Sequence, residues 1–489
     1  MYFQKFKKIF EVYEKGRNMV KILFSHIGEY KKSTLIAPIF IALEAILEML
    51  IPTLMASIID LGLNKGDMSF TVKVGSFTLV IAMVSLTAGI LAGRYASHAS
   101  AGFAKNLRWT MFNKIQQYSF TNIDKFSTAG LITRFTTDVN NIQMSFQLLI
   151  RAFCRAPVML VVAMFMSFLI SPKLSVIFLV AIIFLSCVLA FIMFGVHPYF
   201  SRAIRKYDDL NINLQENISG IRVVKSFIRE KYETNKFKKA TKELKELMLK
   251  GERMIVFIAP AMQLTIFSCI LLLSWLGAKM IVVGDLTTGQ LTSLFAYTTN
   301  ILMSLLMMAM VMVNIVLSRE SGERIALVLN EESSIKNPQN PIKQVKNGDI
   351  EFKNVNFSYS NNPEILNLEN INLKINSGQT IGIIGGTGSS KSALVQLIPR
   401  LYDVISGEVL VGGENVKNYD IKILRDNVAM VLQKNVLFSG TIKENLRWGN
   451  KNSTDSQIEH VCKLAQADEF IQKFPDKYDT YIERGGINV

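Results

Sequence analysis

The chain has 489 residues, of which 50% are hydrophobic, and its mean hydropathy is +0.28. It is too long for one ordinary domain and too apolar for a typical soluble protein, so we expect a membrane protein. The net charge of +15 does not predict a nucleic-acid partner, because the basic residues are spread over the segments between apolar runs, as in membrane proteins with basic cytoplasmic loops.

Residues 1–24 place apolar side chains at helical spacing with lysines between them. This pattern predicts an interfacial helix that lies on the inner membrane surface, in contact with lipid. No short apolar core with a small-residue cleavage site is present here, so we expect no removable signal peptide. The apolar positions are Tyr2, Phe3, Phe6, Ile9, Phe10 and Tyr13, and the lysines are Lys5, Lys7, Lys8 and Lys15.

Six apolar stretches follow, and a helix needs about 20 such residues to cross a bilayer. The third stretch is short by itself and reaches this length only by extending back over residues 146–153, past Arg151 and Arg155. The sequence therefore predicts a six-helix transmembrane domain over residues 25–320. The stretches are Leu35–Ile59, Val74–Gly93, Ala156–Ile170, Leu174–Val196, Met254–Ala278 and Leu286–Ser318.

The connections between these stretches alternate between short turns and long polar segments. The short turns are Asn64–Gly66, Ser171–Lys173 and Val283–Thr288. The long segments, between spans two and three and between spans four and five, are rich in Lys and Arg and have helical patterns. Because basic connections stay in the cytoplasm, we expect the helices to extend out of the membrane on the inner side only.

Four charged side chains fall within the predicted spans, where they are costly in lipid. Glu44 and Glu48 are one turn apart in the first span, and Arg151 and Arg155 belong to the third. They are expected to face the bundle interior or an aqueous cavity. Pairing with one another and contact with a substrate both remain open.

The sixth span carries a stripe of methionines next to an aromatic residue. Such a surface is soft and adaptable, which suits varied apolar ligands. Ordinary helix packing or lipid contact produces the same stripe, so both interpretations stay open. The residues are Phe295, Met303, Met307, Met308, Met310 and Met312.

The composition changes after Ser318. Residues 321–348 are a predicted linker, at first helical and then rich in Asn, Lys and Pro. Residues 349–489 have the pattern of a soluble α/β domain, with alternating apolar residues that predict strands. We expect a strand pair over residues 350–359, a strand at Ile371–Ile375, a buried strand at Thr380–Ile384 and a helix at Ala393–Tyr402.

A glycine-rich loop joins the last predicted strand to the helix, and it matches the pattern GxxxxGK[ST] except at one position. A buried strand before such a loop and a helix after it are the context of a phosphate-binding loop. Its N–H groups are expected to surround a phosphate, Lys391 to neutralise the β- and γ-phosphates, and the Ser392 hydroxyl to bind Mg²⁺. The predicted cofactors are ATP and Mg²⁺. The loop residues are Gly385, Gly386, Thr387, Gly388, Ser389, Ser390, Lys391 and Ser392.

Ser390 stands where the pattern has glycine. If the backbone φ is positive there, serine costs about 1 kcal/mol or more, and affinity for phosphate falls accordingly. If the loop accommodates its small side chain with a slight adjustment, affinity is unchanged. The sequence leaves both outcomes open.

The whole chain resembles the ATP-binding cassette (ABC) exporters, in particular one half of a bacterial heterodimeric multidrug-type exporter. Two segments carry the resemblance. The Q-loop segment Val431–Asn445 matches very specifically, whereas the aromatic loop Val355–Tyr359 would by itself equally suit an ordinary strand. The resemblance implies that Tyr359 stacks on adenine. It also implies a catalytic role for Gln433, which reaches Mg²⁺ and the attacking water.

The resemblance implies a fold, a partner and a mechanism. The fold is a membrane all-α six-helix exporter domain plus a partial α/β P-loop nucleotide-binding domain on the cytoplasmic side of the cell membrane. Residues 121–141 and 216–237 resemble the two coupling loops that press on nucleotide-binding domains. A second half-transporter subunit is the implied partner, and hydrophobic or amphipathic compounds, drugs or lipids, are the implied cargo of an alternating-access cycle.

Residues 484–489 resemble the segment that precedes the signature sequence of this family. The signature, the Walker B aspartate, the catalytic carboxylate and the switch histidine are not among the 489 residues, so we expect a chain truncated before the signature motif. It is expected not to hydrolyse ATP productively by the family mechanism. The alternative function is therefore that of a hydrolysis-incompetent half-transporter fragment that at most binds ATP.

Overall fold

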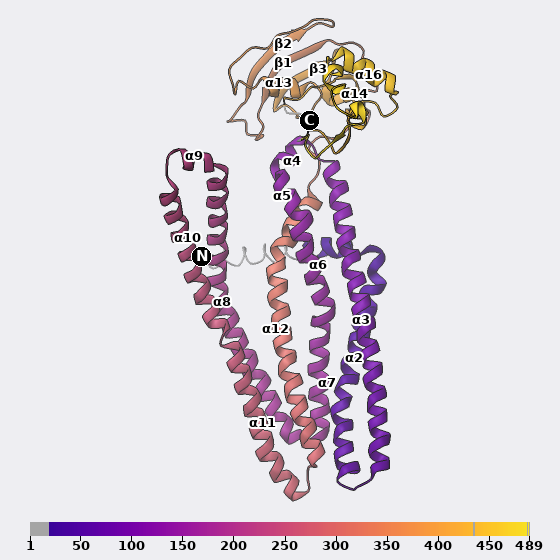
Figure 1. Cartoon of the computed structure of the whole chain (residues 1–489), viewed down its shortest axis with the longest axis vertical. Helices are drawn as coiled ribbons and strands as arrows, with labels where there is room; N and C mark the ends of the chain where they lie inside the picture. Colours follow the sequence, from indigo (N-terminus) through magenta and orange to yellow (C-terminus); the bar gives the residue numbers. More distant parts are fainter. Residues whose placement is uncertain (1–18, 434–435, 487, 489) are drawn as a thin grey trace. The chain divides into compact units, whose positions relative to one another are not determined.

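The computed structural model describes residues 19–433, 436–486 and 488 (Figure 1). The chain forms two compact units. The first contains the residues up to Tyr118 together with Asn122–Glu332, and the second contains Ser119–Thr121 together with Ser333–Val489. Residues 1–18 of the predicted interfacial helix at 1–24 lie outside the described residues. The part that is described is helical, and this helix continues to residue 25.

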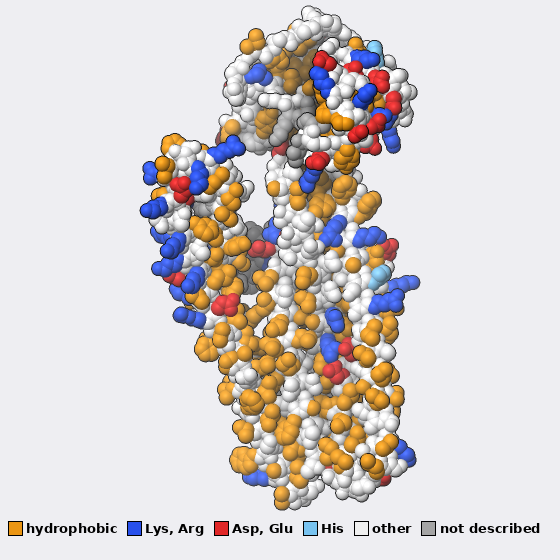
Figure 2. Space-filling model, in the orientation of Figure 1, with side chains coloured by type: hydrophobic (Ala, Val, Ile, Leu, Met, Phe, Trp, Pro, Cys, Tyr) orange, Lys and Arg blue, Asp and Glu red, His pale blue; other side chains and the backbone are white. Residues whose placement is uncertain are grey.

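The first unit is a bundle of long helical segments, and six of those among the described residues are long and apolar enough to cross a membrane, as predicted. Hydrophobic side chains cover these helices, and Lys and Arg gather on the hairpin end where α8 (Pro172–Ser219), α9 (Ile221–Ser226) and α10 (Glu230–Ile255) meet (Figure 2). The six candidate spans are Gly28–Leu63, Met68–Gln116, Thr128–Ile170, Pro172–Ser219, Glu230–Val283 and Thr288–Asn330. All of them extend beyond the apolar stretches seen in the sequence.

Several of these spans are built from more than one helical segment. The α-helices are α2 (Lys31–Ser57), α3 (Met68–Gln116), α4 (Phe120–Phe126), α5 (Thr128–Thr133), α6 (Val139–Leu148), α7 (Cys154–Ile170), α8 (Pro172–Ser219), α9 (Ile221–Ser226), α10 (Glu230–Ile255), α11 (Ile258–Val283) and α12 (Thr288–Asn330). Three segments are π-helical, η2 (Ile58–Leu63), η3 (Arg134–Asp138) and η4 (Leu149–Phe153), and η1 (Gly28–Tyr30) is a 3₁₀ turn.

Capping residues set where the helices begin after the short turns. The Asp67 carboxylate accepts from the Phe70 N–H at 2.9 Å at the start of α3. Ser171 caps α8, whose first residue is Pro172. Thr287 and Gln290 cap α12 reciprocally. These caps satisfy N–H groups that lack partners within the helix, so each hairpin turns within a few residues.

An ion pair between a buried carboxylate and a partly exposed arginine fixes the first cytoplasmic excursion, the segment at residues 94–145 between the second and third apolar stretches, to α12. Asp138 is fully buried, and Arg324 donates to both of its oxygens, at 2.8 and 2.6 Å. The Tyr118 hydroxyl also donates to the Val328 carbonyl at 2.6 Å. A two-pronged Arg–carboxylate contact is geometrically specific, so it sets the register between this excursion and the end of the sixth span.

The second unit is built on a four-stranded antiparallel sheet with the order β2-β1-β3-β4. Its core lies between the inward side chains of β1 and β3 and the helices α13 and α14. The strands are β1 (Ile350–Phe357), β2 (Leu368–Ile375), β3 (Ser406–Val411), β4 (Glu414–Asn415), β5 (Gly440–Thr441) and β6 (Tyr481–Ile482). The helices are α13 (Lys391–Leu397), α14 (Ile421–Asn427), α15 (Ile442–Leu446), α16 (Asp455–Leu464) and α17 (Asp468–Ile471), with 3₁₀ turns η5 (Val416–Asn418) and η6 (Lys477–Asp479).

Three local predictions in this unit are wrong. Residues 350–359 contain one strand, β1, because its pairing with β2 continues past two irregularities in register without a turn. Residues 380–384 are not a strand, and Ile384 is 98% exposed. A strand needs neighbours to bond its N–H and C=O groups, and no described strand pairs with this segment. The helix predicted at 393–402 ends at Leu397, because Pro399 has no N–H to continue the helical hydrogen bonds and Arg400 has a left-handed backbone.

Candidate functional site

Residues 385–392 form the loop that leads into α13, and the Lys391 ammonium folds back onto this loop. Its Nζ donates to the carbonyl oxygens of Gly385 and Gly386, at 2.8 Å each, and lies 3.2 Å from Ser389 Oγ. The Ser389 hydroxyl donates to the Gly386 carbonyl at 2.9 Å. Neutral oxygens thus hold a cation on the loop, and an anionic ligand offers this cation stronger, charge-assisted contacts.

Two loop residues have a left-handed backbone. Gly388 has φ +85°, and Ser390, directly before α13, has φ +58° and ψ +22°. Glycine adopts this conformation freely, whereas a residue with a Cβ pays about 1–2 kcal/mol. Ser390 therefore has the positive φ at which a serine is strained and a glycine is not.

The loop has the chemistry to hold a nucleotide phosphate. A Cβ at Gly386 or Gly388 would meet no atom within 4 Å, so there is open space beside the backbone. Residues 385–389 and Ser392 are exposed. Among the residues described here, no group of three or more His, Cys, Asp and Glu side chains is placed to bind a metal. A Mg²⁺ held by Ser392 would therefore take further ligands from phosphate and water, as this ion commonly does.

Tyr359 lies just beyond β1 and contacts the helix that begins with Lys391. Its hydroxyl donates to Gln396 Oε1 on α13 at 3.0 Å. Its ring meets Phe357 and Tyr402 edge to face, with centroids 4.9 and 5.1 Å apart, and the residue is 40% exposed. A partly exposed aromatic ring joined to this helix fits a role in stacking on a base.

Among the described residues, the structure shows no hydrogen bond between Gln433 and the loop. Gln433 is exposed in an irregular segment. The next two residues of the predicted Q-loop segment, 434 and 435, lie outside the described part of the chain. The catalytic and metal-binding roles of Gln433 stay predictions.

Comparison with known proteins decides the family. The family profile for the ABC transporter transmembrane region matches residues 34–306, and a second ABC transporter profile matches residues 368–484. The ABC transporter ATP-binding protein YfiB of Bacillus subtilis is 33% identical over 467 residues, which cover 95% of this chain and 81% of YfiB. This chain belongs to the ABC transporters.

Other relatives of this ABC transporter match a similar share of this chain. The ABC transporter ATP-binding protein Rv1273c of Mycobacterium tuberculosis is 31% identical over 96% of this chain and 81% of its own length. ABC transporter B family member 4 of Dictyostelium discoideum is 28% identical over 90% of this chain and 57% of its own length. The chain is thus a multi-pass membrane protein of half-transporter type with a cytoplasmic ATP-binding domain.

Within the spans of this ABC transporter, one arginine joins two carboxylates. Arg155 Nη1 lies 2.5 Å from Glu44 Oε1, and Nη2 lies 2.5 Å from Glu48 Oε2. The Arg155 Nε also donates to Met159 Sδ. Of the two interpretations of these charges, pairing and substrate contact, the structure shows pairing for three of the four side chains, because Arg155 binds both glutamates. Arg151 is exposed.

Sequence reasoning missed the residues that follow α13. Arg400 is 5% exposed, has φ +51°, and forms an ion pair with Asp403. The ion pair between Arg400 and Asp403 was not predicted, because a helix was expected to continue through Tyr402. An available signal was Pro399, which ends the helix and leaves an Arg and an Asp three residues apart in a turn.

The left-handed conformation of Ser390 leads to a prediction. Ser390→Gly is expected to tighten ATP binding about fivefold, because relief of about 1 kcal/mol of strain lets the loop keep its binding conformation at lower cost. Equilibrium binding of a fluorescent ATP analogue measures this. Ser390→Ala keeps the Cβ and serves as the control. Equal or weaker affinity of the glycine variant would show that the loop tolerates serine.

Proposed function

We propose that this chain is the ATP-binding subunit of an ABC exporter that moves hydrophobic or amphipathic compounds, drugs or lipids, across the cytoplasmic membrane by alternating access. The observation that carries the proposal is the loop at 385–392, where a lysine ammonium rests on two backbone carbonyls at the start of a helix. This loop belongs to a chain with six membrane spans.

The residues of the loop have separate roles in this proposal. Lys391 leaves the carbonyls of Gly385 and Gly386 and turns toward the β- and γ-phosphates, while the loop N–H groups bind phosphate oxygens. Ser392 binds Mg²⁺, Tyr359 orients the base, and Gln433 orients the attacking water. Bound ATP supplies the free energy that closes two nucleotide-binding domains.

The proposed partner is a second half-transporter subunit. The α9 turn supports this, because it exposes apolar side chains at the end of a cytoplasmic hairpin. Val223, Phe227 and Ile228 are 60, 73 and 83% exposed. Such a cluster is unfavourable in water, and a nucleotide-binding domain that covers it would receive the movement of α8 and α10.

The sixth span supports the proposed class of cargo. Met303 and Met310 on α12 are 48 and 60% exposed, and Met307 and Met312 are 38 and 39% exposed. Flexible thioether side chains adapt to differently shaped apolar molecules. This stripe therefore supports a cargo of varied hydrophobic compounds.

Uptake into inside-out membrane vesicles tests this function. The probes are rhodamine 6G and a fluorescent phosphatidylcholine analogue, each with and without ATP. ATP-dependent accumulation of either probe that disappears in Lys391→Ala supports an exporter of that compound. Accumulation by the wild type that is no greater than in Lys391→Ala or in vesicles without the chain would contradict it.

A second candidate function is ATP binding without turnover. The surroundings of Gln433 favour it, because among the described residues no hydrogen bond joins this proposed catalytic residue to residues 385–392. We predict negligible ATP hydrolysis by the purified chain alone, with phosphate release no faster than in Lys391→Ala. Turnover clearly above that control would exclude this candidate and show that the site is completed in another way.

A further inference from the structure

The turn Arg400–Asp403 is attached directly to the helix of the nucleotide loop. The Arg400 N–H donates to the Leu397 carbonyl at 3.1 Å, and the Leu401 N–H donates to the Gln396 carbonyl at 3.0 Å. Any shift of α13 therefore moves this turn with it. In the second unit the turn meets two segments that continue into the membrane helices, the residues after α12 and the residues after α3.

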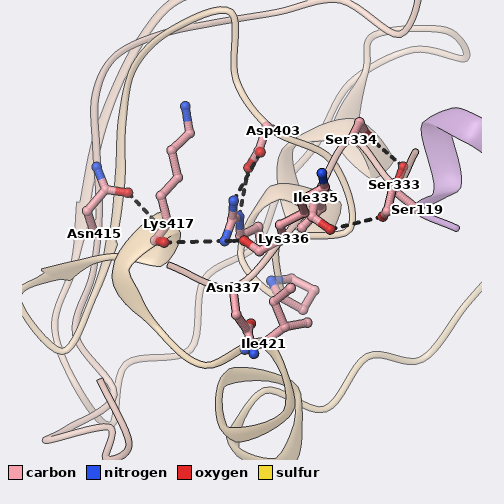
Figure 3. A network of polar contacts seen from close by, with 12 residues as sticks. Ser119, Ser333, Ser334, Ile335, Lys336, Asn337, Asp403, Asn415, Lys417 and Ile421 are labelled. Carbon is pink, nitrogen blue, oxygen red and sulfur yellow. Dashed lines mark hydrogen bonds and ion pairs between the residues drawn. The ribbon is translucent and has the colours of Figure 1, made fainter. Parts of the chain in front are cut away.

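Arg400 contacts the segment that follows α12. Its guanidinium donates to both carboxylate oxygens of Asp403, at 2.9 and 3.2 Å, and to the carbonyls of Lys417 and Lys336, at 3.3 and 3.5 Å (Figure 3). Lys336 lies six residues beyond the last residue of α12, Asn330. The side chain of a residue in the nucleotide-binding unit thus holds the chain that leads from the sixth span.

The same segment also contacts the first cytoplasmic excursion. The hydroxyls of Ser334 and Ser119 lie 2.6 Å apart (Figure 3). Asn337 adds a second attachment, because its side chain donates to Asp420 at 2.9 Å and accepts from the Ile421 N–H at 2.9 Å. Ser119 therefore rests on a segment that is fixed to the sheet domain at two points.

Tyr402 makes a second connection to this excursion. Its buried ring lies edge to face with Tyr359 at 5.1 Å and contacts Phe120 at 5.9 Å. Tyr359 is the residue proposed to stack on the base. The turn Arg400–Asp403 thereby contacts the proposed base-stacking residue Tyr359 through Tyr402. It contacts the segments that lead to the membrane helices through the pairs Tyr402–Phe120 and Arg400–Lys336.

The chain passes between the two units at three places, after Tyr118, after Thr121 and after Glu332. We propose that Arg400 and Tyr402 are positioning residues that couple nucleotide occupancy to all three crossings. Occupancy of the loop and of Tyr359 shifts α13 and the Tyr402 ring, and the turn passes this shift to residues 119–121 and 333–337. The inference rests on the proposed nucleotide site and adds the residues that transmit its state.

Hydrogen exchange of the full chain in detergent micelles tests the proposal, with and without Mg²⁺ and the non-hydrolysed analogue AMP-PNP. In the wild type, AMP-PNP is expected to slow exchange in peptides covering residues 119–121 and 333–337 by about threefold or more. Phe120→Ala is expected to remove most of this slowing at 119–121, and Arg400→Gln at 333–337. Both variants are expected to keep the wild-type affinity for AMP-PNP.

Two controls separate coupling from mere structural support. Phe112→Ala removes another exposed phenylalanine, eight residues earlier on α3, and is expected to respond like the wild type. Tyr402→Phe keeps the ring contacts and is expected to do the same. Variants that exchange faster in both states, with an unchanged nucleotide effect, would overturn the inference, as would a full wild-type response in Phe120→Ala. A parallel titration distinguishes a failed inference from a failed nucleotide site, since wild-type chain that binds no AMP-PNP would overturn both.

Discussion

Lys391→Ala is expected to abolish photolabelling of the chain by 8-azido-ATP. The Lys391 ammonium is the cation that the loop holds on two carbonyls, and its charge-assisted contacts with phosphate contribute about 1.5–3 kcal/mol. Loss of about 1.5–3 kcal/mol of binding free energy weakens ATP binding by about ten- to a hundredfold. Labelling in isolated membranes at a sub-saturating concentration of the probe, with excess ATP as competitor, measures the effect.

Lys422→Ala is the matched control, because Lys422 is an exposed lysine on α14 in the same unit. It is expected to label like the wild type. Unchanged labelling of Lys391→Ala would show that residues 385–392 do not bind the nucleotide. Loss of labelling in both variants would point to a general effect of lysine removal.

Arg155→Met is expected to destabilise the membrane unit by about 2–3 kcal/mol. The substitution leaves Glu44 and Glu48 without their shared counter-charge, and an unpaired charge within a membrane is costly. A thermal melt in detergent micelles measures the loss as a lower unfolding temperature. Transport assays are not needed, so the result is independent of the proposed function.

Two further variants make this second result specific. Arg151→Met removes an exposed arginine four residues earlier and is expected to melt close to the wild type. The triple variant Arg155→Met, Glu44→Gln, Glu48→Gln removes all three charges and is expected to recover most of the lost stability. If Arg155→Met alone melts like Arg151→Met, the ion cluster does not stabilise the bundle.

The membrane spans were predictable because length and polarity alone decide them, as the candidate span Thr128–Ile170 illustrates. Its apolar part was too short, yet extension past Arg151 and Arg155 was inferred, and the structure confirms a long span there. The pairing of Arg155 was not predictable. Its partners are 111 and 107 residues away in the chain, and no local pattern selects between pairing and substrate contact.

The nucleotide loop was predictable as a motif but not in its surroundings. A strand at 380–384 was expected from its apolar sequence, whereas strand formation depends on neighbours that are remote in sequence. The end of α13 was open to local reasoning, since Pro399 marks it. The contacts of Arg400 with Lys336 and Lys417 were not, because backbone carbonyls leave no trace in a residue pattern.

The π-helical segment η4 has a consequence for the ion cluster that follows it. One residue of a regular helix corresponds to a rotation of about 100° around the axis, so the wider turn at Leu149–Phe153 resets the direction of every side chain after it. In this register Arg155 faces Glu44 and Glu48. Which charges meet inside the bundle therefore depends on how many residues a single turn of backbone contains.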